Sequence, residues 1–254
     1  MLNSTQRFSS RVGNYVKYRP HYPAAVVDLL RRECGLAPAS VVADIGSGTG
    51  ILTELLLKNG NPVFGVEPNQ EMREAAERLL ARYPAFHSVN GTAENTTLVE
   101  HGIDLVTAGQ AFHWFNRDKA RAEFVRILKP HGWVALMWND RNISDRPFFK
   151  AYENLLVGFG TDYEAVGAKH VDEKIIGSFF HPAKFRVAQF PNQQEFDYQG
   201  LRGRLLSSSY APEPGHPRHV PMLQALEGIF QEHATAGKVT FEYDTTVYYG
   251  QLTP

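Results

Sequence analysis

A glycine-rich segment that follows a short apolar run constrains the fold of this chain more than any other feature. Residues 40–45 are mostly apolar and have the length of one buried strand. Gly46, Gly48 and Gly50 follow directly. Glycines at such a turn let the backbone approach a ligand closely, and the N-terminus of the next helix offers free N–H groups to it. The segment therefore predicts a strand, a ligand-binding loop and a helix in succession.

This turn belongs to a regular alternation of predicted elements. Strands are expected at residues 40–45, 62–67, 85–89, 103–108 and 132–138. Helices are expected at residues 8–18, 23–34, 49–59, 69–81 and 116–128, with Asn69 and Asn116 as N-caps of the last two. The alternation predicts an α/β fold, a doubly wound and mostly parallel sheet whose ligand site lies at the carboxyl ends of the strands.

The pattern changes after Asn139. Helices are expected at residues 147–158, 201–206 and 222–233, and two further strands at residues 185–190 and 239–249. We interpret the helices as a partial cap and the strands as the antiparallel edge of one seven-stranded sheet. Residues 1–140 would then form the N-terminal helical segment and the cofactor-binding core, residues 141–235 the partial cap with an edge strand on the substrate side, and residues 236–254 the closing strand.

Composition excludes several classes of protein. The chain has 26 basic and 27 acidic residues, a balance that argues against a protein built to bind nucleic acid. Cys34 is the only cysteine, and the histidines show no metal-ligand spacing, so we expect neither a disulfide nor a metal site. The first ten residues lack a signal-peptide core, and no apolar run approaches the ~20 residues that span a bilayer. We expect a cytoplasmic protein, a monomer or homodimer, without a membrane partner.

The spacing of the glycines separates two kinds of cofactor. Gly46, Gly48 and Gly50 follow the pattern G-x-G-x-G, whereas dinucleotide-binding loops follow G-x-G-x-x-G. Asp44 lies two residues before the first glycine, where a carboxylate favours a methionyl ammonium but has no use beside a pyrophosphate. Glu67 ends the second predicted strand and can accept both hydroxyls of a ribose in either kind of site. The loop therefore favours S-adenosylmethionine, and an NAD-dependent oxidoreductase is the alternative.

The ordered set of motifs between Val41 and Trp138 resembles the class I S-adenosylmethionine-dependent methyltransferases. It comprises the loop Asp44-Ile45-Gly46-Ser47-Gly48-Thr49-Gly50, the acid Glu67, the segment Asn90-Gly91-Thr92-Ala93-Glu94, and Leu128-Lys129-Pro130-His131-Gly132, in which His131 replaces a glycine of the family's turn. Two more segments resemble the small-molecule subgroup that includes trans-aconitate methyltransferases. They are Tyr15-Val16-Lys17-Tyr18-Arg19-Pro20 and Gln110-Ala111-Phe112-His113-Trp114-Phe115.

The resemblance, together with the place of each residue relative to the predicted strands, gives the candidate site. Residues that would bind the cofactor are Tyr18, Arg19, Asp44, Gly46, Ser47, Gly48, Glu67, Pro68, Thr92, Ala93, Glu94, Gln110 and Ala111. Residues that would face the substrate are Tyr15, His113, Trp114, Asn139 and Arg141. His113 is the candidate catalytic residue, either as a proton acceptor or as a group that orients the substrate. Arg141 could hold a carboxylate in bidentate fashion, and so could Arg202 or Arg204 if residues 201–206 belong to the cap. The run Ser207-Ser208-Ser209-Tyr210 could supply hydroxyl contacts.

These expectations combine into one function. The chain is expected to transfer a methyl group from S-adenosylmethionine in line to a small polar molecule, with a carboxylic acid as one candidate. The alternatives are a methyltransferase acting on RNA or protein, the NAD-dependent oxidoreductase named above, and a protein that binds the cofactor without catalysis.

Overall fold

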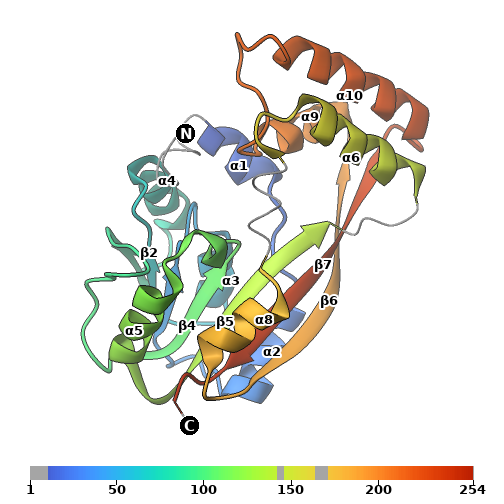
Figure 1. Ribbon diagram of the computed structural model, residues 1–254. Coiled ribbons are helices and arrows are strands. Elements are labelled where there is room, and N and C mark those ends of the chain that lie inside the picture. Colours follow the sequence, from blue (N-terminus) through green and yellow to red (C-terminus); the bar gives the residue numbers. More distant parts are fainter. Residues whose placement is uncertain (1–10, 142–145, 164–170, 254) are drawn as a thin grey trace.

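The computed structural model describes residues 11–141, 146–163 and 171–253, and its centre is a seven-stranded sheet with the order β3-β2-β1-β4-β5-β7-β6 (Figure 1). The strands are β1 (Val42–Ile45), β2 (Val63–Val66), β3 (Phe86–Val89), β4 (Ile103–Gly109), β5 (Leu128–Arg141), β6 (Phe185–Phe196) and β7 (Val239–Gly250). The first five pair in parallel, whereas β7 pairs antiparallel with both β5 and β6. The predicted α/β sheet with an antiparallel edge is therefore confirmed, as a mixed sheet.

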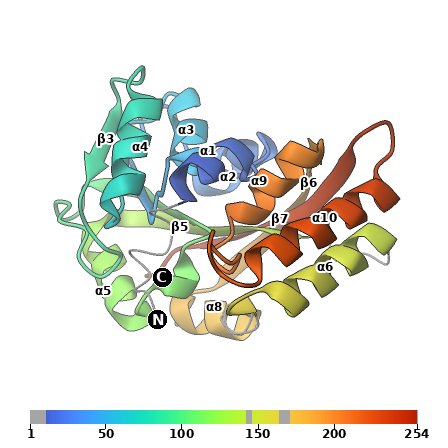
Figure 2. The same cartoon turned by 90° about the horizontal axis from the view of Figure 1, so that it is seen from above.

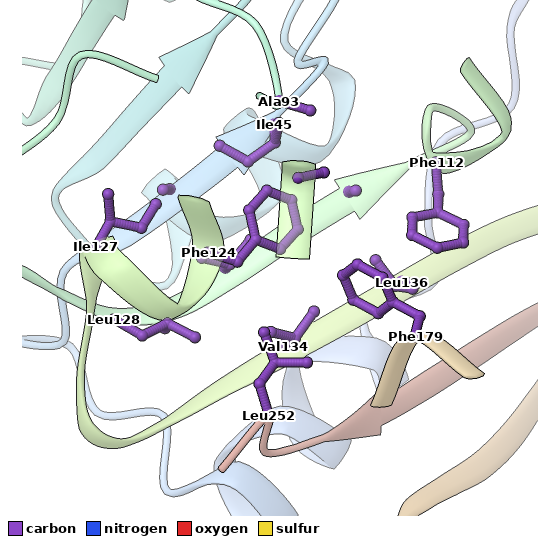
Figure 3. Packing of buried hydrophobic residues seen from close by; sticks show 14 of the residues in the cluster. Ile45, Ala93, Phe112, Phe124, Ile127, Leu128, Val134, Leu136, Phe179 and Leu252 are labelled. Atoms are coloured by element: carbon purple, nitrogen blue, oxygen red, sulfur yellow. The ribbon is translucent and has the colours of Figure 1, made fainter. Parts of the chain in front are cut away.

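Helices cover both faces of this sheet. One face carries α2 (Ala25–Cys34), α3 (Ile51–Lys58) and α4 (Gln70–Leu80), and the other carries α5 (Arg117–Ile127) and α8 (Glu173–Phe180). Figure 3 shows the second interface, where Phe124 and Phe179 point from the two helices toward the strands. The rings of Phe112 and Phe179 meet edge to face with centroids 4.8 Å apart. Among the described helices, none is both long and apolar enough to cross a bilayer.

Short polar side chains set the beginnings of several helices. The side-chain oxygens of Asn69 and Asn116 accept hydrogen bonds from the backbone amides of Met72 and Lys119, so both predicted N-caps are confirmed. Asp172 caps α8 in the same way, through the amide of Ile175 at 2.8 Å. No helix was expected at this place in the sequence, so α8 is a described α-helix that the sequence analysis did not predict.

Two strands, β5 and β6, are longer than predicted because each of them pairs with β7. β5 was expected to end at residue 138 but continues to Arg141, which lies opposite Tyr243 of β7. β6 was expected to end at residue 190 but pairs with β7 as far as Phe196. At its start β5 includes the segment read as a turn, where the register with β4 shifts between Ile103 and Leu105. His131 there takes the left-handed conformation, with φ of 64°, that a glycine occupies at little cost.

The long outer halves of β6 and β7 carry a cap of three helices. These are α6 (Pro147–Phe159), α9 (Tyr198–Leu206) and α10 (His219–His233), and α6 and α10 lie side by side (Figure 2). Their common core is centred on Phe241 of β7, which is fully buried. Its ring meets those of Phe148, Phe149 and Tyr152 edge to face, with centroids 5.0–5.7 Å apart.

The N-terminal helix α1 (Val12–Tyr18) packs against the cap helix α9. The ring of Tyr18 occupies the space that a side chain at position 203 would need. α1 can therefore pack this closely on α9 only because residue 203 is a glycine. Just before α1, Arg11 donates to the backbone carbonyls of Leu206 (3.3 Å), Ser208 and Ala211 (2.7 Å). The first residues of the expected helix, 8–10, lie outside the described ranges.

Replacing Phe241 by alanine should lower the free energy of unfolding by about 3–5 kcal/mol, because it opens a cavity at the centre of the cap core. Val220→Ala on α10 is the matched control, since that side chain is 60% exposed, and it should change stability by less than about 0.5 kcal/mol. Urea unfolding of both variants provides the measurement. Equal effects would contradict the assignment of Phe241 to the core.

Candidate functional site

Two adjoining cavities lie where the carboxyl ends of the central strands face the cap. The first, of about 440 Å³, is lined by Arg141 and is called the Arg141 cavity. The second, of about 330 Å³, is lined by Glu67 and is called the Glu67 cavity. Both are lined by Tyr15, Arg19, Gly46, Gly109, Gln110 and Tyr210. These shared residues mark the junction of the two cavities, and the glycine loop lies at it.

The glycine loop is fixed at this junction by close packing. Gly46 has φ of +69°, and a Cβ on it would stand 2.6 Å from the Cβ of Ala111. Only glycine therefore fits between β1 and the segment that follows β4. The amides of Gly46 and Ser47 donate to the carbonyl of Val66 at 2.8 and 3.2 Å. These bonds tie the loop to the end of β2.

The carboxylate of Glu67 is held by backbone amides at the edge of its cavity. Oε2 accepts from the amide of Gly48 and Oε1 from that of Asn69, both at 2.9 Å. Burial raises the pKa of Glu67, and the two amides offset part of that rise. Each carboxylate oxygen keeps a further lone pair. The group is thus oriented and can still accept hydrogen bonds from a ligand.

Asp44 is buried, with 1% of its surface exposed, and lines the Arg141 cavity. Its oxygens accept from the hydroxyl of Thr53 at 2.6 Å and that of Thr107 at 3.0 Å. Burial raises the pKa of Asp44 to about 6, although both hydroxyls act against this rise. The side chain therefore also links β1, α3 and β4, a structural role that the sequence reading did not include.

Arg19 presents an unsatisfied donor at the junction. Its Nη2 donates to the carbonyl of Ser207 at 2.8 Å, and its guanidinium stacks over the ring of Tyr15 with 5.0 Å between centres. Its Nε is buried and has no hydrogen-bond partner among the described residues. Burial, reinforced by the nearby Arg204, lowers the pKa of Arg19. A buried guanidinium nitrogen without a partner favours an anionic ligand at this place.

The structure brings most of the predicted residues to these cavities but divides them. The Glu67 cavity receives Gly48, Glu67, Pro68, Thr92, Ala93, Glu94, Ala111, His113 and Trp114. The Arg141 cavity receives Asp44, Ser47, Asn139 and Arg141. The residues expected to face the substrate are therefore not all together: His113 and Trp114 lie beside the expected cofactor residues, whereas Asn139 and Arg141 lie under the cap.

One predicted cofactor residue lies elsewhere. Tyr18 lines neither cavity, because its ring faces away from the junction and packs against Gly203 in the cap. The helical period explains the difference. Tyr15 lies one turn earlier on α1 and faces the cavities, whereas Tyr18 and Gly203 form the contact between α1 and α9.

Two lining residues of the Arg141 cavity, Tyr22 and Tyr163, were not singled out from the sequence, because no motif marks them. Of the cap residues that the sequence offered as alternatives, Arg204 and Tyr210 line this cavity, whereas Arg202 lines neither. Within the described ranges, no group of three or more His, Cys, Asp or Glu side chains is arranged to hold a metal ion.

Comparison with known proteins decides the family. Residues 43–136 match the methyltransferase domain family. A methyltransferase-like protein of Schizosaccharomyces pombe is 30% identical over 204 residues, which are 80% of this chain and 77% of that protein. The chain belongs to the class I S-adenosylmethionine-dependent methyltransferases. The alternative of an NAD-dependent oxidoreductase is therefore wrong.

Further relatives agree with this family. An uncharacterized methyltransferase of Mycobacterium tuberculosis is 38% identical over 135 residues, 53% of each chain, so this methyltransferase matches about half the length of that relative. In fold, a solved structure of a candidate type II methyltransferase from Anaeromyxobacter dehalogenans has a TM-score of 0.67 at 22% identity. It covers 93% of this chain and 99% of its own. That likeness extends to the capped, outer part of the molecule.

The residues of this methyltransferase fit the family's cofactor, S-adenosylmethionine. The Nε of Arg19, unpartnered among the described residues, suits its carboxylate, the open space beside Gly48 admits a ligand close to the backbone, and the oriented carboxylate of Glu67 suits a ribose. The two joined cavities offer room for the cofactor and for a second molecule at the same junction.

The raised pKa of Asp44 predicts a pH dependence of stability. The folded protein binds this proton more tightly than the unfolded chain, because the pKa is about 6 rather than its ordinary 3.8. The resulting stabilisation is complete below about pH 4 and is lost as the pH rises through about 6. The free energy of unfolding of the wild type, minus that of Asp44→Asn, should therefore fall by up to roughly 3 kcal/mol between pH 4 and pH 7.5.

Urea unfolding of the ligand-free proteins across this range measures the difference. Asp28→Asn is the control, because the Asp28 side chain is 67% exposed, and it should reproduce the wild-type profile. If the difference in the free energy of unfolding between wild type and Asp44→Asn does not change with pH, the carboxyl group of Asp44 does not titrate in this way.

Proposed function

We propose that this chain transfers a methyl group from S-adenosylmethionine to a small polar molecule by in-line displacement. The junction of the two cavities carries the proposal. A cofactor in the Glu67 cavity and an acceptor in the Arg141 cavity would meet beside Gly46, Gly109 and Gln110. When bound, S-adenosylmethionine supplies an electrophilic methyl carbon on a sulfur that leaves without charge.

The binding roles follow from the division of the residues. Glu67 accepts the ribose hydroxyls, with Pro68 beside it, and Thr92, Ala93 and Glu94 contact the adenine. The loop formed by Gly46, Ser47 and Gly48 lies against the methionyl end, whose ammonium faces Asp44. Arg19 binds the methionyl carboxylate through its buried Nε. Gln110 and Ala111 line the cofactor close to the sulfur.

These residues promote the reaction by aligning the methyl donor with the acceptor. Holding two reactants in the reactive geometry can contribute roughly 7–11 kcal/mol to the lowering of a barrier. Gln110 is well fixed for this purpose, because its amide donates to the carbonyl of Met137 at 2.9 Å and its Nε2 to that of Asn139 at 3.0 Å. The junction is thus rigid on the side of β4 and β5.

A carboxylic acid is the acceptor that we favour within the class of small polar molecules. Arg141 and Asn139 lie in the Arg141 cavity, with Tyr15 at the junction, and a guanidinium suits a carboxylate. The segments at residues 15–20 and 110–115 that resemble trans-aconitate methyltransferases support the same class. A carboxylate nucleophile needs no base. For a hydroxyl or amine, His113 beside Trp114 would accept the proton or orient the acceptor, and a base contributes about 10²–10⁴-fold.

The test has two stages. Isothermal titration with S-adenosylmethionine and S-adenosylhomocysteine should show binding, and its absence at millimolar ligand would remove the proposal. A screen of small acids, phenols and amines, with release of S-adenosylhomocysteine as readout, should then find acceptors among the acids. Turnover on RNA or protein, with none on the small molecules, would replace the acceptor class with a macromolecular one.

Glu67→Gln should weaken the binding of S-adenosylhomocysteine by roughly 10- to 100-fold, because the amide loses the charge and one acceptor oxygen. Isothermal titration gives the dissociation constant. Glu74→Gln on α4, the helix that follows Glu67, is the control, since Glu74 is exposed and lies outside both cavities. It should bind as the wild type does, and similar affinities for both variants would place the ribose elsewhere.

His113→Ala should lower kcat more than it weakens cofactor binding if His113 acts on the acceptor. A loss of roughly 10²-fold or more in kcat, with an unchanged dissociation constant for S-adenosylhomocysteine, is the expected result for a proton acceptor. A raised dissociation constant with little change in kcat would instead assign His113 to the adenosine, in line with its place in the Glu67 cavity.

A further inference from the structure

Arg204 is a buried cation on the inner side of the cap. It lies on α9, only 5% of its surface is exposed, and it lines the Arg141 cavity but not the Glu67 cavity. Its neighbours in sequence, Gly203 and Leu205, are buried against α1 and the cap core. The side chain therefore faces the Arg141 cavity and not the cavity of the predicted adenosine site.

The protein gives this cation polar and aromatic neighbours but no carboxylate. Nε of Arg204 donates to the hydroxyl of Tyr243 at 3.1 Å, and Nη1 donates to that of Ser208 at 3.2 Å. The rings of Phe241 and Tyr243 lie 5.6 and 5.9 Å from the guanidinium carbon. Nη2 makes no hydrogen bond to a described residue. Burying a charge is costly unless an opposite charge pairs with it.

The acidic side chain of Glu153 is engaged by a second cation, Arg141. Arg141, whose side chain is 15% exposed, bonds through Nη2 to Glu153 at 3.1 Å and to the hydroxyl of Tyr163. Its Nη1 and Nε make no hydrogen bonds to described residues. Arg19 adds a third guanidinium at the junction, and Asp140 lines the cavity as an exposed carboxylate. Three cations thus face the space, and their acidic neighbours are Asp44 and Asp140, which line the cavity, and Glu153, which pairs with Arg141.

The pKa of Tyr210 depends on the electrostatic potential in the Arg141 cavity. Its ring stacks edge to face on Tyr163 with centroids 4.9 Å apart, and the residue lines both cavities. Burial acts to raise the pKa of its phenol, but Arg141, Arg204 and Arg19, with a hydrogen bond from Ser208, outweigh burial and lower the pKa. The arginines are the larger of these lowering causes, so the phenol lies in a positive field. That field favours any anion that enters.

We propose that Arg204, with Arg141 beside it, binds a carboxylate of the methyl acceptor and so makes the enzyme specific for anionic acceptors. This inference rests on the function proposed above and adds a residue and a subsite to it. The free Nη2 of Arg204 and the free Nη1 and Nε of Arg141 supply the donors, and a planar guanidinium matches a carboxylate. The methionyl carboxylate is bound separately by Arg19.

The experiment uses acetate as the smallest carboxylate that the subsite can hold. The full-length protein is saturated with S-adenosylhomocysteine, so that Arg19 is occupied, and Tm is measured against acetate at constant ionic strength with chloride as the balancing anion. Acetate should raise Tm in a saturable way, and neutral acetamide should not. Arg204→Met should weaken the apparent affinity for acetate by about 10- to 100-fold.

Arg202→Met is the matched control, because Arg202 lies on the same helix but outside both cavities. It should keep the wild-type response to acetate. Arg204→Lys is the second variant, to be used if Arg204→Met does not fold. Lysine keeps the positive charge but lacks the parallel N–H donors of the planar guanidinium. This variant should therefore respond to acetate more weakly than the wild type. With an acceptor from the screen, Arg204→Met should raise KM by a similar factor while the dissociation constant for S-adenosylhomocysteine stays unchanged.

Each other outcome has a definite meaning. An equal acetate response in wild type and both Arg204 variants overturns the inference, as does a wild type that ignores acetate. Loss of S-adenosylhomocysteine binding in Arg204→Met would assign Arg204 to the cofactor. An equal or stronger response to inorganic phosphate would replace the carboxylate with a phosphate. If the wild type does not bind S-adenosylhomocysteine at all, the proposed function fails first, and this result is separate from the others.

Discussion

The buried carboxylate of Asp44 is the interaction on which the site depends. It joins the hydroxyls of Thr53 on α3 and Thr107 on β4 at the point where β1 gives way to the glycine loop. Those two bonds fix the direction in which the loop leaves the sheet. The close contact of Gly46 with Ala111 and the bond from Gly48 to Glu67 then fix its height above the strands. The carboxylate of Asp44 therefore helps to hold the glycine loop in its conformation independently of any ligand.

The core of the fold was predictable because its elements follow local rules. Each parallel strand is a short apolar run, and the N-caps Asn69 and Asn116 mark helix starts within one residue of those observed. The same regularity placed Glu67, Thr92 and Ala111 at one edge of the sheet, where they line a common cavity. Order along the chain was sufficient there, since parallel strands bring their carboxyl ends together.

The outer part was less predictable because its structure depends on distant partners. β5 and β6 extend past the ends of their apolar runs since both pair with β7, β6 along its full length and β5 as far as Tyr243. The helix α8 is short, and its buried side chains Ile176, Phe179 and Phe180 show their period only over two turns. Arg202 and Arg204 were equivalent candidates in sequence, because an inward and an outward arginine of one helix look alike. Arg204 is buried because it packs on Phe241 and Tyr243 of β7, a contact that no local pattern expresses.

The contacts of Arg11 have a consequence for how the protein is made. Its bonds to Leu206, Ser208 and Ala211 join positions about 195 to 200 residues apart. Contacts of such long sequence separation form late, because a large loop must close first. During synthesis, the sheet and its glycine loop can assemble while α1 still has no surface on which to dock. The wall of the cavities that carries Tyr15 and Arg19 is therefore completed only after the last third of the chain has emerged, so that an unfinished chain holds a formed loop but an open site.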